Sequence, residues 1–397
     1  MASSESGKPW RANVPTVMFV VTTPFAVNAF LANHIAALLT NSKVILCTNL
    51  DAYKLAPALL NSVELHHIPF SRRVSLGTDL KSLLMLTALV RQARPAVIHS
   101  ITPKAGLLAM LAGLMGRVPN RWHTFTGQVW ATKLGLSRSA LMAIDRIIVL
   151  LASKVFADSA SQCRLLRDEG VVRDGQIGML GSGSIAGVDI KRFCSDTLNR
   201  ERLRQQMGTD ANACVFLFVG RLTKDKGMFD LIRSFLELSA TVRDIELWAV
   251  GPDEEGLLQT LQESAEGCGA PIRWLGATPT PEQFMVAADV LLLPSYREGF
   301  GSVIIEAAAC GIPAIAYRID GVIDAIVDGS SGLLVEVGQP EAFAAAMKRL
   351  ALDKELRLLL GKQAQDRAVR DFSSAKVTDA WLEFYRSHLN QQDEEVC

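Results

Sequence analysis

The chain has 397 residues, which is too long for one ordinary hydrophobic core, so its length predicts two domains. Its 49% hydrophobic and 21% charged residues exclude a disordered chain. The formal net charge is zero, but residues 1–190 carry 19 Lys and Arg against 10 Asp and Glu, which suggests that the first half faces an anionic partner.

Strand-like and helix-like segments alternate along the first half. Residues 1–13 are polar and lack an apolar signal-peptide core, so we expect a disordered lead-in. The apolar runs that follow predict strands at 14–22, 43–47, 63–68 and 96–99 and helices at 30–39, 79–92 and from 102 onward. This alternation predicts an α/β fold with a doubly wound parallel sheet.

The same alternation returns in the second half, with strands predicted at 215–219, 246–251, 272–276, 290–294 and 314–317. A stretch rich in Gly and Ser at 181–193 has the composition of a hinge. The predicted division is therefore a first domain at 14–188 and a second domain at 189–375, followed by a last helix at 376–390.

A phosphate site is predicted after the strand at 215–219. The strand ends in Gly220-Arg221-Leu222-Thr223-Lys224-Asp225-Lys226-Gly227, and a helix-like segment follows. A strand, a glycine turn, two cations and a helix form a phosphate site at the carboxyl edge of a parallel sheet. The planar guanidinium of Arg221 can donate hydrogen bonds to two phosphate oxygens at once, and the Lys226 ammonium adds a second positive charge. The alternative, two ordinary surface cations, explains this placement less well.

Two carboxylates stand eight positions apart in the segment from Glu298 to Glu306. Glu298 is expected in a Gly-Phe-Gly loop at the mouth of a helix that carries Glu306 on one face. The neighbours of Glu306 are apolar, and a buried carboxylate needs a partner. The arrangement suits a ligand with hydroxyls at both ends and negative charge between them, as in a nucleotide sugar.

The pairing of Gly-Arg-x4-Lys with Glu-Gly-Phe-Gly-x4-Glu, followed by Asp320-Gly321 and Asp328-Gly329, resembles the retaining GT-B glycosyltransferases of family 4, also called group 1. The resemblance covers roughly residues 14 to 385. It implies two Rossmann-like domains that face a cleft, with the C-terminal helix crossing back to the first domain. The chain is similar to bacterial transferases that build O-antigens, capsules and lipid-linked oligosaccharides.

The resemblance implies a role for each motif residue. Arg221 and Lys226 would stabilise the departing diphosphate, Glu298 would hold hydroxyls of the transferred sugar, and Glu306 would hold the ribose. The expected catalytic residues are Arg221, Lys226, Glu298 and His123. The expected donor-binding residues are Gly220, Arg221, Lys226, Gly276, Ala277, Glu298, Gly299, Phe300, Gly301, Ser302 and Glu306.

The first domain would bind the acceptor. Relatives often have a histidine immediately before the glycine at the place of Gly127, whereas this chain has Thr126 there and His123 three residues earlier. His123 could replace the missing histidine, a backbone carbonyl could suffice, or His123 could be a core residue. The loop after the first strand lacks glycine, and its polar residues suit either acceptor contact or helix capping. The expected acceptor-binding residues are Thr23, Asn28, Lys104, Thr126 and Gly127.

These features together predict a hexosyltransferase that moves a hexose or N-acetylhexosamine from a UDP-sugar to a polyprenyl-pyrophosphate-linked sugar. It would work with retention and without a metal or other cofactor, at an anionic inner-membrane surface and without nucleic acid. The cysteines show no zinc spacing, and no apolar run reaches spanning length, so we expect a cytoplasmic, peripheral bacterial protein. The alternatives are a UDP-sugar 2-epimerase of the same fold and a non-catalytic sugar-nucleotide-binding subunit.

Overall fold

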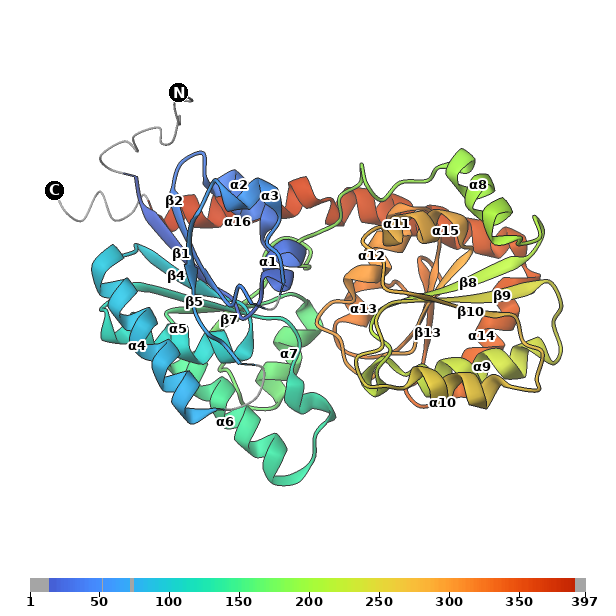
Figure 1. The fold of residues 1–397 in the computed structure, drawn as a ribbon, viewed down its shortest axis with the longest axis horizontal. Coiled ribbons are helices and arrows are strands. Elements are labelled where there is room, and N and C mark those ends of the chain that lie inside the picture. The colour runs from blue at the N-terminus through green and yellow to red at the C-terminus, as the bar shows by residue number, and fades with distance from the viewer. Residues whose placement is uncertain (1–13, 52, 72–74, 390–397) are drawn as a thin grey trace.

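The computed structural model describes residues 14–51, 53–71 and 75–389, so the lead-in predicted at 1–13 lies outside the described residues. The molecule has two lobes, each built around one parallel sheet with helices on both faces (Figure 1). The predicted fold class, two Rossmann-like domains, is confirmed.

The sheet of the first lobe has seven strands, and every neighbouring pair is parallel. Its order reverses direction between β1 and β4, which is the kind of switch point where open α/β sheets bind ligands. In sheet order the strands are β3 (Glu64–His67), β2 (Lys43–Thr48), β1 (Thr16–Val20), β4 (Val97–Ser100), β5 (Asn120–Phe125), β6 (Lys154–Ala157) and β7 (Ile177–Gly178).

Helices cover both faces of this sheet. One layer holds α4 (Leu76–Ala93), α5 (Pro103–Met115), α6 (Gly135–Leu151) and α7 (Ala160–Asp168), with the short turn η1 (Val129–Thr132) before α6. The other holds α1 (Pro24–Phe30), α2 (Ala32–Leu38), α3 (Pro57–Leu60) and the C-terminal α16 (Ser374–Leu389). The helix predicted at 30–39 corresponds to α2, whereas α1 was not predicted; it begins at Pro24 because proline suits the first helical position.

The sheet of the second lobe has six parallel strands, and its order reverses between β8 and β11. Along β8, Val215 and Leu217 enter one core while Phe216 and Phe218 enter the other. Both faces are covered, so the strand reads as a continuous apolar run. In sheet order the strands are β10 (Ile272–Gly276), β9 (Ile245–Val250), β8 (Cys214–Val219), β11 (Val290–Leu293), β12 (Ala314–Tyr317) and β13 (Gly332–Val335).

The helices of the second lobe also form two layers. One contains α8 (Thr197–Met207), α11 (Pro281–Ala287), α12 (Ser302–Ala309), α13 (Val322–Ala325) and α15 (Lys354–Phe372). The other contains α9 (Met228–Ser239), α10 (Leu258–Ala265) and α14 (Pro340–Leu352), and the turn η2 (Lys224–Lys226) precedes α9.

The chain crosses between the lobes twice, and the two crossings pair with each other. The Val188 N–H donates to the Phe372 carbonyl at 2.8 Å, and the Ser374 N–H donates to the Val188 carbonyl at 2.8 Å. Beyond this bridge α16 runs back onto the first lobe (Figure 1), where Tyr385 hydrogen-bonds to His99 in its core. The predicted return of the C-terminal helix is therefore confirmed.

Candidate active site

The two motif loops of the second lobe meet at the switch point of its sheet. One loop follows β8 and the other follows β11, and these strands are neighbours. The Lys226 ammonium lies 2.5 Å from Oε1 of Glu298, and both side chains are mostly buried. A cation and a carboxylate from segments 72 residues apart are thus held together at the carboxyl edge of the sheet.

Arg221 lies at the start of the first loop and is half-exposed. Its Nη1 donates to a carboxylate oxygen of Glu254 at 3.1 Å, in the loop that follows β9. An exposed pair of this kind contributes little to stability, so the guanidinium remains available for a stronger anion.

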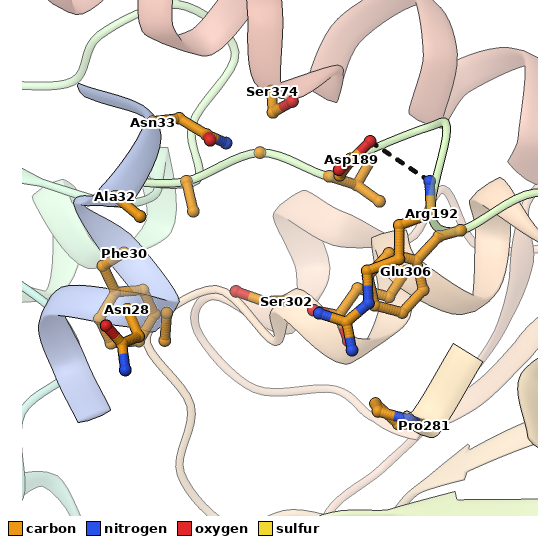
Figure 2. A pocket seen from close by; sticks show the side chains of 15 residues that line it. Asn28, Phe30, Ala32, Asn33, Asp189, Arg192, Pro281, Ser302, Glu306 and Ser374 are labelled. Atoms are coloured by element: carbon orange, nitrogen blue, oxygen red, sulfur yellow. Dashed lines mark hydrogen bonds between the residues drawn. The ribbon is translucent and has the colours of Figure 1, made fainter. Parts of the chain in front are cut away.

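Glu306 lies on α12 and lines a cavity of about 350 Å³ between the lobes. Burial raises the pKa of this carboxyl to about 7, an effect that nearby Arg192 opposes and Glu282 reinforces. Figure 2 shows α1 and its side chain Asn28 across the cavity from Glu306. We call this cavity the hinge pocket, since its lining includes the crossing segments at Gly187, Val188, Asp189 and Ser374 as well as Phe30 and Ser302.

Glu298 lines a different cavity, also of about 350 Å³, on the other side of its loop. This second cavity is formed by both lobes, and its lining includes Trp130, Arg138, Gln162, Arg297, Arg318 and Asp320. The two glutamates of the motif therefore face separate spaces, with the segment from Gly299 to Ser302 between them.

The remaining predicted donor-binding residues lie at the same sheet edge. Phe300 is buried against Phe372, their ring centroids 5.1 Å apart, and Gly301 caps α12, whose first residue is Ser302. Gly220 follows β8, Gly276 is the last residue of β10, and Ala277 follows it. The Gly276 carbonyl accepts from the Gly251 N–H at 2.8 Å.

The first lobe meets the second motif at Thr126 and Gly127, just after β5. A Cβ placed on Gly299 would lie 2.6 Å from the Thr126 carbonyl oxygen, and one on Gly127 would lie 2.9 Å from the Gly299 nitrogen. Both distances are too short for a real side chain, so the two backbones approach as only glycine allows. The structure thus brings Thr126 and Gly127 to Glu298.

His123 does not lie in this cleft, and the position disfavours the catalytic role expected for it. The residue is fully buried within β5, and its Nδ1 lies 2.8 Å from the Ser100 hydroxyl. Burial lowers the pKa of the imidazole to about 3, so the ring stays neutral. His123 packs against Gly106 of α5 and is therefore a core residue, which is one of the alternatives that the sequence leaves open.

The other acceptor candidates have structural partners in the first lobe. The Asn28 amide donates to the Lys54 carbonyl at 3.0 Å and accepts from the Ala56 N–H at 2.9 Å, so it fixes the loop after β2. The Lys104 ammonium lies 2.9 Å from Asp79 on α4. Thr23 is the N-cap residue of α1, although its side chain makes no capping hydrogen bond.

The sequence analysis missed several residues that surround Glu298. The carboxyl of Asp158 after β6 is buried, and the first turn of α7 contacts the second lobe through Ser159, Ser161 and Gln162. A Ser-x-x-Gln capping pattern marks the start of α7 but gives no sign of this contact. The described residues contain no group of three or more His, Cys, Asp or Glu side chains placed to share a metal ion.

Comparison with known proteins places the chain in a family. Residues 32–181 match the family described as "Glycosyl transferase 4-like domain", and residues 199–367 match "Glycosyl transferases group 1". The capsular polysaccharide biosynthesis glycosyltransferase CapM of Staphylococcus aureus is 30% identical over 335 residues, which cover 83% of this chain and 86% of CapM. This chain is a group 1 glycosyltransferase.

Other relatives and solved structures agree with this glycosyltransferase family. The lipopolysaccharide core biosynthesis glycosyltransferase LpsE of Rhizobium meliloti is 32% identical over 186 residues, which are 46% of this chain and 53% of LpsE. A crystal structure of Anabaena Alr3699/HepE in complex with UDP and glucose superposes with a TM-score of 0.77 at 20% identity, and it covers 94% of this chain and 100% of that one. At this identity the likeness concerns the GT-B fold.

Proposed function

We propose that this glycosyltransferase moves a hexosyl or N-acetylhexosaminyl group from a UDP-sugar to a polyprenyl-pyrophosphate-linked sugar, with retention and without a metal ion. The contact between Lys226 and Glu298 carries the proposal, because it sets a cation for the diphosphate beside a carboxylate for the sugar hydroxyls. A UDP-sugar donor is supported by the structural neighbour that holds UDP and glucose, and a role in surface polysaccharide synthesis is supported by the relatives named for capsule and lipopolysaccharide synthesis.

The donor would lie across the loop between Glu298 and Glu306, with its nucleoside at Glu306 and its sugar at Glu298. Glu306 would accept hydrogen bonds from the ribose in the hinge pocket, whose volume suits a nucleoside. The diphosphate would then lie by Lys226, Arg221 and the first N–H groups of α12, which is eight residues long. Glu298 would hold the transferred sugar at the far end, beside Thr126 and Gly127 of the first lobe.

In the proposed reaction the acceptor hydroxyl attacks the anomeric carbon from the face on which the phosphate leaves. The bond from the acceptor oxygen to that carbon forms as the bond from the carbon to the phosphate oxygen breaks. The departing phosphate oxygen takes the acceptor proton, so neither glutamate needs to become a nucleophile. Negative charge grows on the diphosphate, and the fixed cations Lys226 and Arg221 stabilise it more in the transition state than before.

A panel of single donors tests this proposal. UDP- and GDP-sugars are incubated one at a time with the protein and a lipid-pyrophosphate-linked sugar, with and without EDTA, and released nucleotide and product mass are measured. We expect transfer from a UDP-sugar that EDTA leaves unchanged, with the anomeric configuration of the donor kept. A donor converted to its 2-epimer would support the epimerase alternative, and donor binding without any turnover would support the non-catalytic one.

The outer surface of the first lobe supports the membrane part of the proposal. Leu76 on α4 is 85% exposed, and Leu134 and Leu136 at the start of α6 are 87% and 90% exposed. Between residues 76 and 151 the only acidic residues are Asp79, which pairs with Lys104, and the buried Asp145. Exposed leucines on a surface with few acidic residues match the interface of an anionic bilayer, although Arg138 on α6 pairs with Glu169. The described chain has no helix both long and apolar enough to cross a membrane.

Changing Leu134 and Leu136 together to Glu is expected to weaken binding to anionic vesicles by about 100-fold or more. Withdrawing two leucines from the acyl boundary forfeits roughly 3 kcal/mol, and the new charges are repelled. Co-sedimentation with vesicles that contain phosphatidylglycerol measures the effect. Leu198→Glu is the matched control, because Leu198 is 79% exposed but lies on α8 of the second lobe. Equal vesicle binding by the double variant and the control would contradict the membrane surface.

A further inference from the structure

The first turn of α7, in the first lobe, forms hydrogen bonds with the backbone of the loop that carries Glu298. The Gln162 amide nitrogen donates to the Glu298 carbonyl at 3.1 Å, and the Ser159 hydroxyl donates to the Gly299 carbonyl at 3.2 Å. These contacts join segments 136 and 140 residues apart. The loop is therefore held by the opposite lobe at the two residues next to the sugar-binding carboxylate.

Ser161 ties the same turn to the next loop of the second lobe. Its backbone N–H donates to Oδ2 of Asp324 at 2.9 Å, its hydroxyl donates to the same oxygen, and the Gly321 N–H donates to its hydroxyl oxygen at 2.6 Å. Arg367 of α15 in turn binds the Asp324 carbonyl at 2.6 Å. The contact is thus anchored in the framework of the second lobe.

Helix capping alone does not explain these side chains. Ser159 accepts from the Gln162 N–H at 3.2 Å, as a capping serine does. In a closed capping box the glutamine side chain would return to the backbone of Ser159. Here the Gln162 side chain, only 2% exposed, donates to the Glu298 carbonyl instead. Its hydrogen bond therefore joins the two lobes and does not cap the helix.

We propose that Ser159, Ser161 and Gln162 form a positioning clamp, which holds the Glu298 loop against the first lobe so that its carboxylate and Lys226 face the bound sugar. The proposal rests on the proposed function, since it takes Glu298 to be the residue that holds the sugar. Side-chain positions at such sites must hold to within about 0.5 Å, so a released loop is expected to lower turnover while leaving the nucleotide site intact.

We expect the clamp to depend on pH, because the buried carboxyl of Asp158 lies against the Glu298 loop, where a Cβ placed on Gly299 would clash with Oδ2 of Asp158. Burial raises the pKa of this group to about 8, and the nearby carboxylates of Glu298 and Asp324 also act to raise it. Cys163 faces it from α7, and Lys226 is engaged by Glu298. As the pH rises through about 8, Asp158 loses its proton beside these two carboxylates, and their repulsion loosens the clamp.

Gln162→Leu and Ser161→Ala test the clamp against Arg167→Ala, a change on the exposed side of the same helix. With the donor found by the panel, we expect kcat/KM to fall by about 10- to 100-fold in both clamp variants. The Kd for UDP should stay within about twofold of wild type, and the amides of 298–302 should exchange hydrogen faster. Wild-type turnover should fall above pH 8, and Asp158→Asn should remove that fall.

Three results would overturn the clamp: unchanged kcat/KM in both variants, unchanged amide exchange at 298–302, or a loss of UDP affinity equal to the loss of turnover. The last result would mean a merely structural role. Hydrogen exchange needs no substrate, so it tests the clamp even if the protein transfers sugar from none of the donors. A wild-type protein that transfers from no donor would contradict the proposed function, whatever the clamp variants show.

Discussion

Lys226→Met is expected to lower the transfer rate by about 10²- to 10³-fold, the size of effect seen when one charge-stabilising donor is removed from an active site. Methionine keeps an unbranched apolar stem but removes the ammonium that lies 2.5 Å from Glu298. The diphosphate then leaves without its nearest fixed cation. Affinity for UDP should also fall, because the lost charge would contact the phosphates already in the ground state. Steady-state kinetics and calorimetric titration with UDP measure the two effects.

Lys224→Met is the matched control for this experiment. Lys224 lies in the same short turn, η2, but is exposed, and its backbone N–H is the group that bonds to Glu255. The control should keep turnover within about twofold, since a cation in solvent contributes little. If Lys226→Met also kept near-normal turnover, Lys226 would have no role at the phosphate. Thermal unfolding of both variants shows whether the unpaired Glu298 carboxylate has disturbed the fold.

Gly227→Ala is expected to destabilise the protein far more than Gly208→Ala, although both glycines have similar backbone conformations. Their φ angles are 71° and 63°, and an alanine in this region costs roughly 1 kcal/mol. At Gly208 a Cβ would meet nothing within 4 Å. At Gly227 it would overlap the Pro294 carbonyl oxygen and lie 2.8 Å from its carbon, which adds about 1–3 kcal/mol of overpacking.

The clash would also act on the active site, because the backbone at Pro294 leads into the loop that carries Glu298. We expect Gly227→Ala to lower both the melting temperature and the turnover of the folded fraction, and Gly208→Ala to lower the melting temperature slightly at most. Differential scanning calorimetry and kinetics on the same samples measure this. Equal melting temperatures for the two variants would show that the two motif loops are not in contact in solution.

Much of the fold and of the second-lobe site followed from local pattern. A buried parallel strand needs apolar residues on both faces, so β8 and β11 read as continuous apolar runs, and the residues after them must lie at the carboxyl edge. The two strands are adjacent, so Lys226 and Glu298 in the loops after them come into contact. These predictions succeed because each one depends only on the sequence of one strand and of the turn that follows it.

The environment of single side chains was less predictable. The sequence around His123 does not show whether its ring points into the cleft or into the core. In the structure the ring packs against Gly106 in the core. Asn28 and Lys104 looked available for an acceptor, but Asn28 of α1 bonds to Lys54 in the loop after β2, and Lys104 of α5 pairs with Asp79 of α4. Both contacts depend on how these elements pack. From the sequence, a polar residue that follows a strand is therefore only a candidate site residue. The group that its side chain contacts in the folded protein shows whether it has a structural role.

The sequence by itself indicated two parallel sheets and the motif loops of the second lobe, but it did not reveal strands β5, β6, β7 and β13. Only the tertiary structure decided that the two motif glutamates line separate cavities and that Gln162 holds the Glu298 loop. The reason is physical. Periodicity and turn chemistry act within one or two elements, whereas a hydrogen bond between residues 136 apart depends on how two whole domains dock, and it leaves no local pattern.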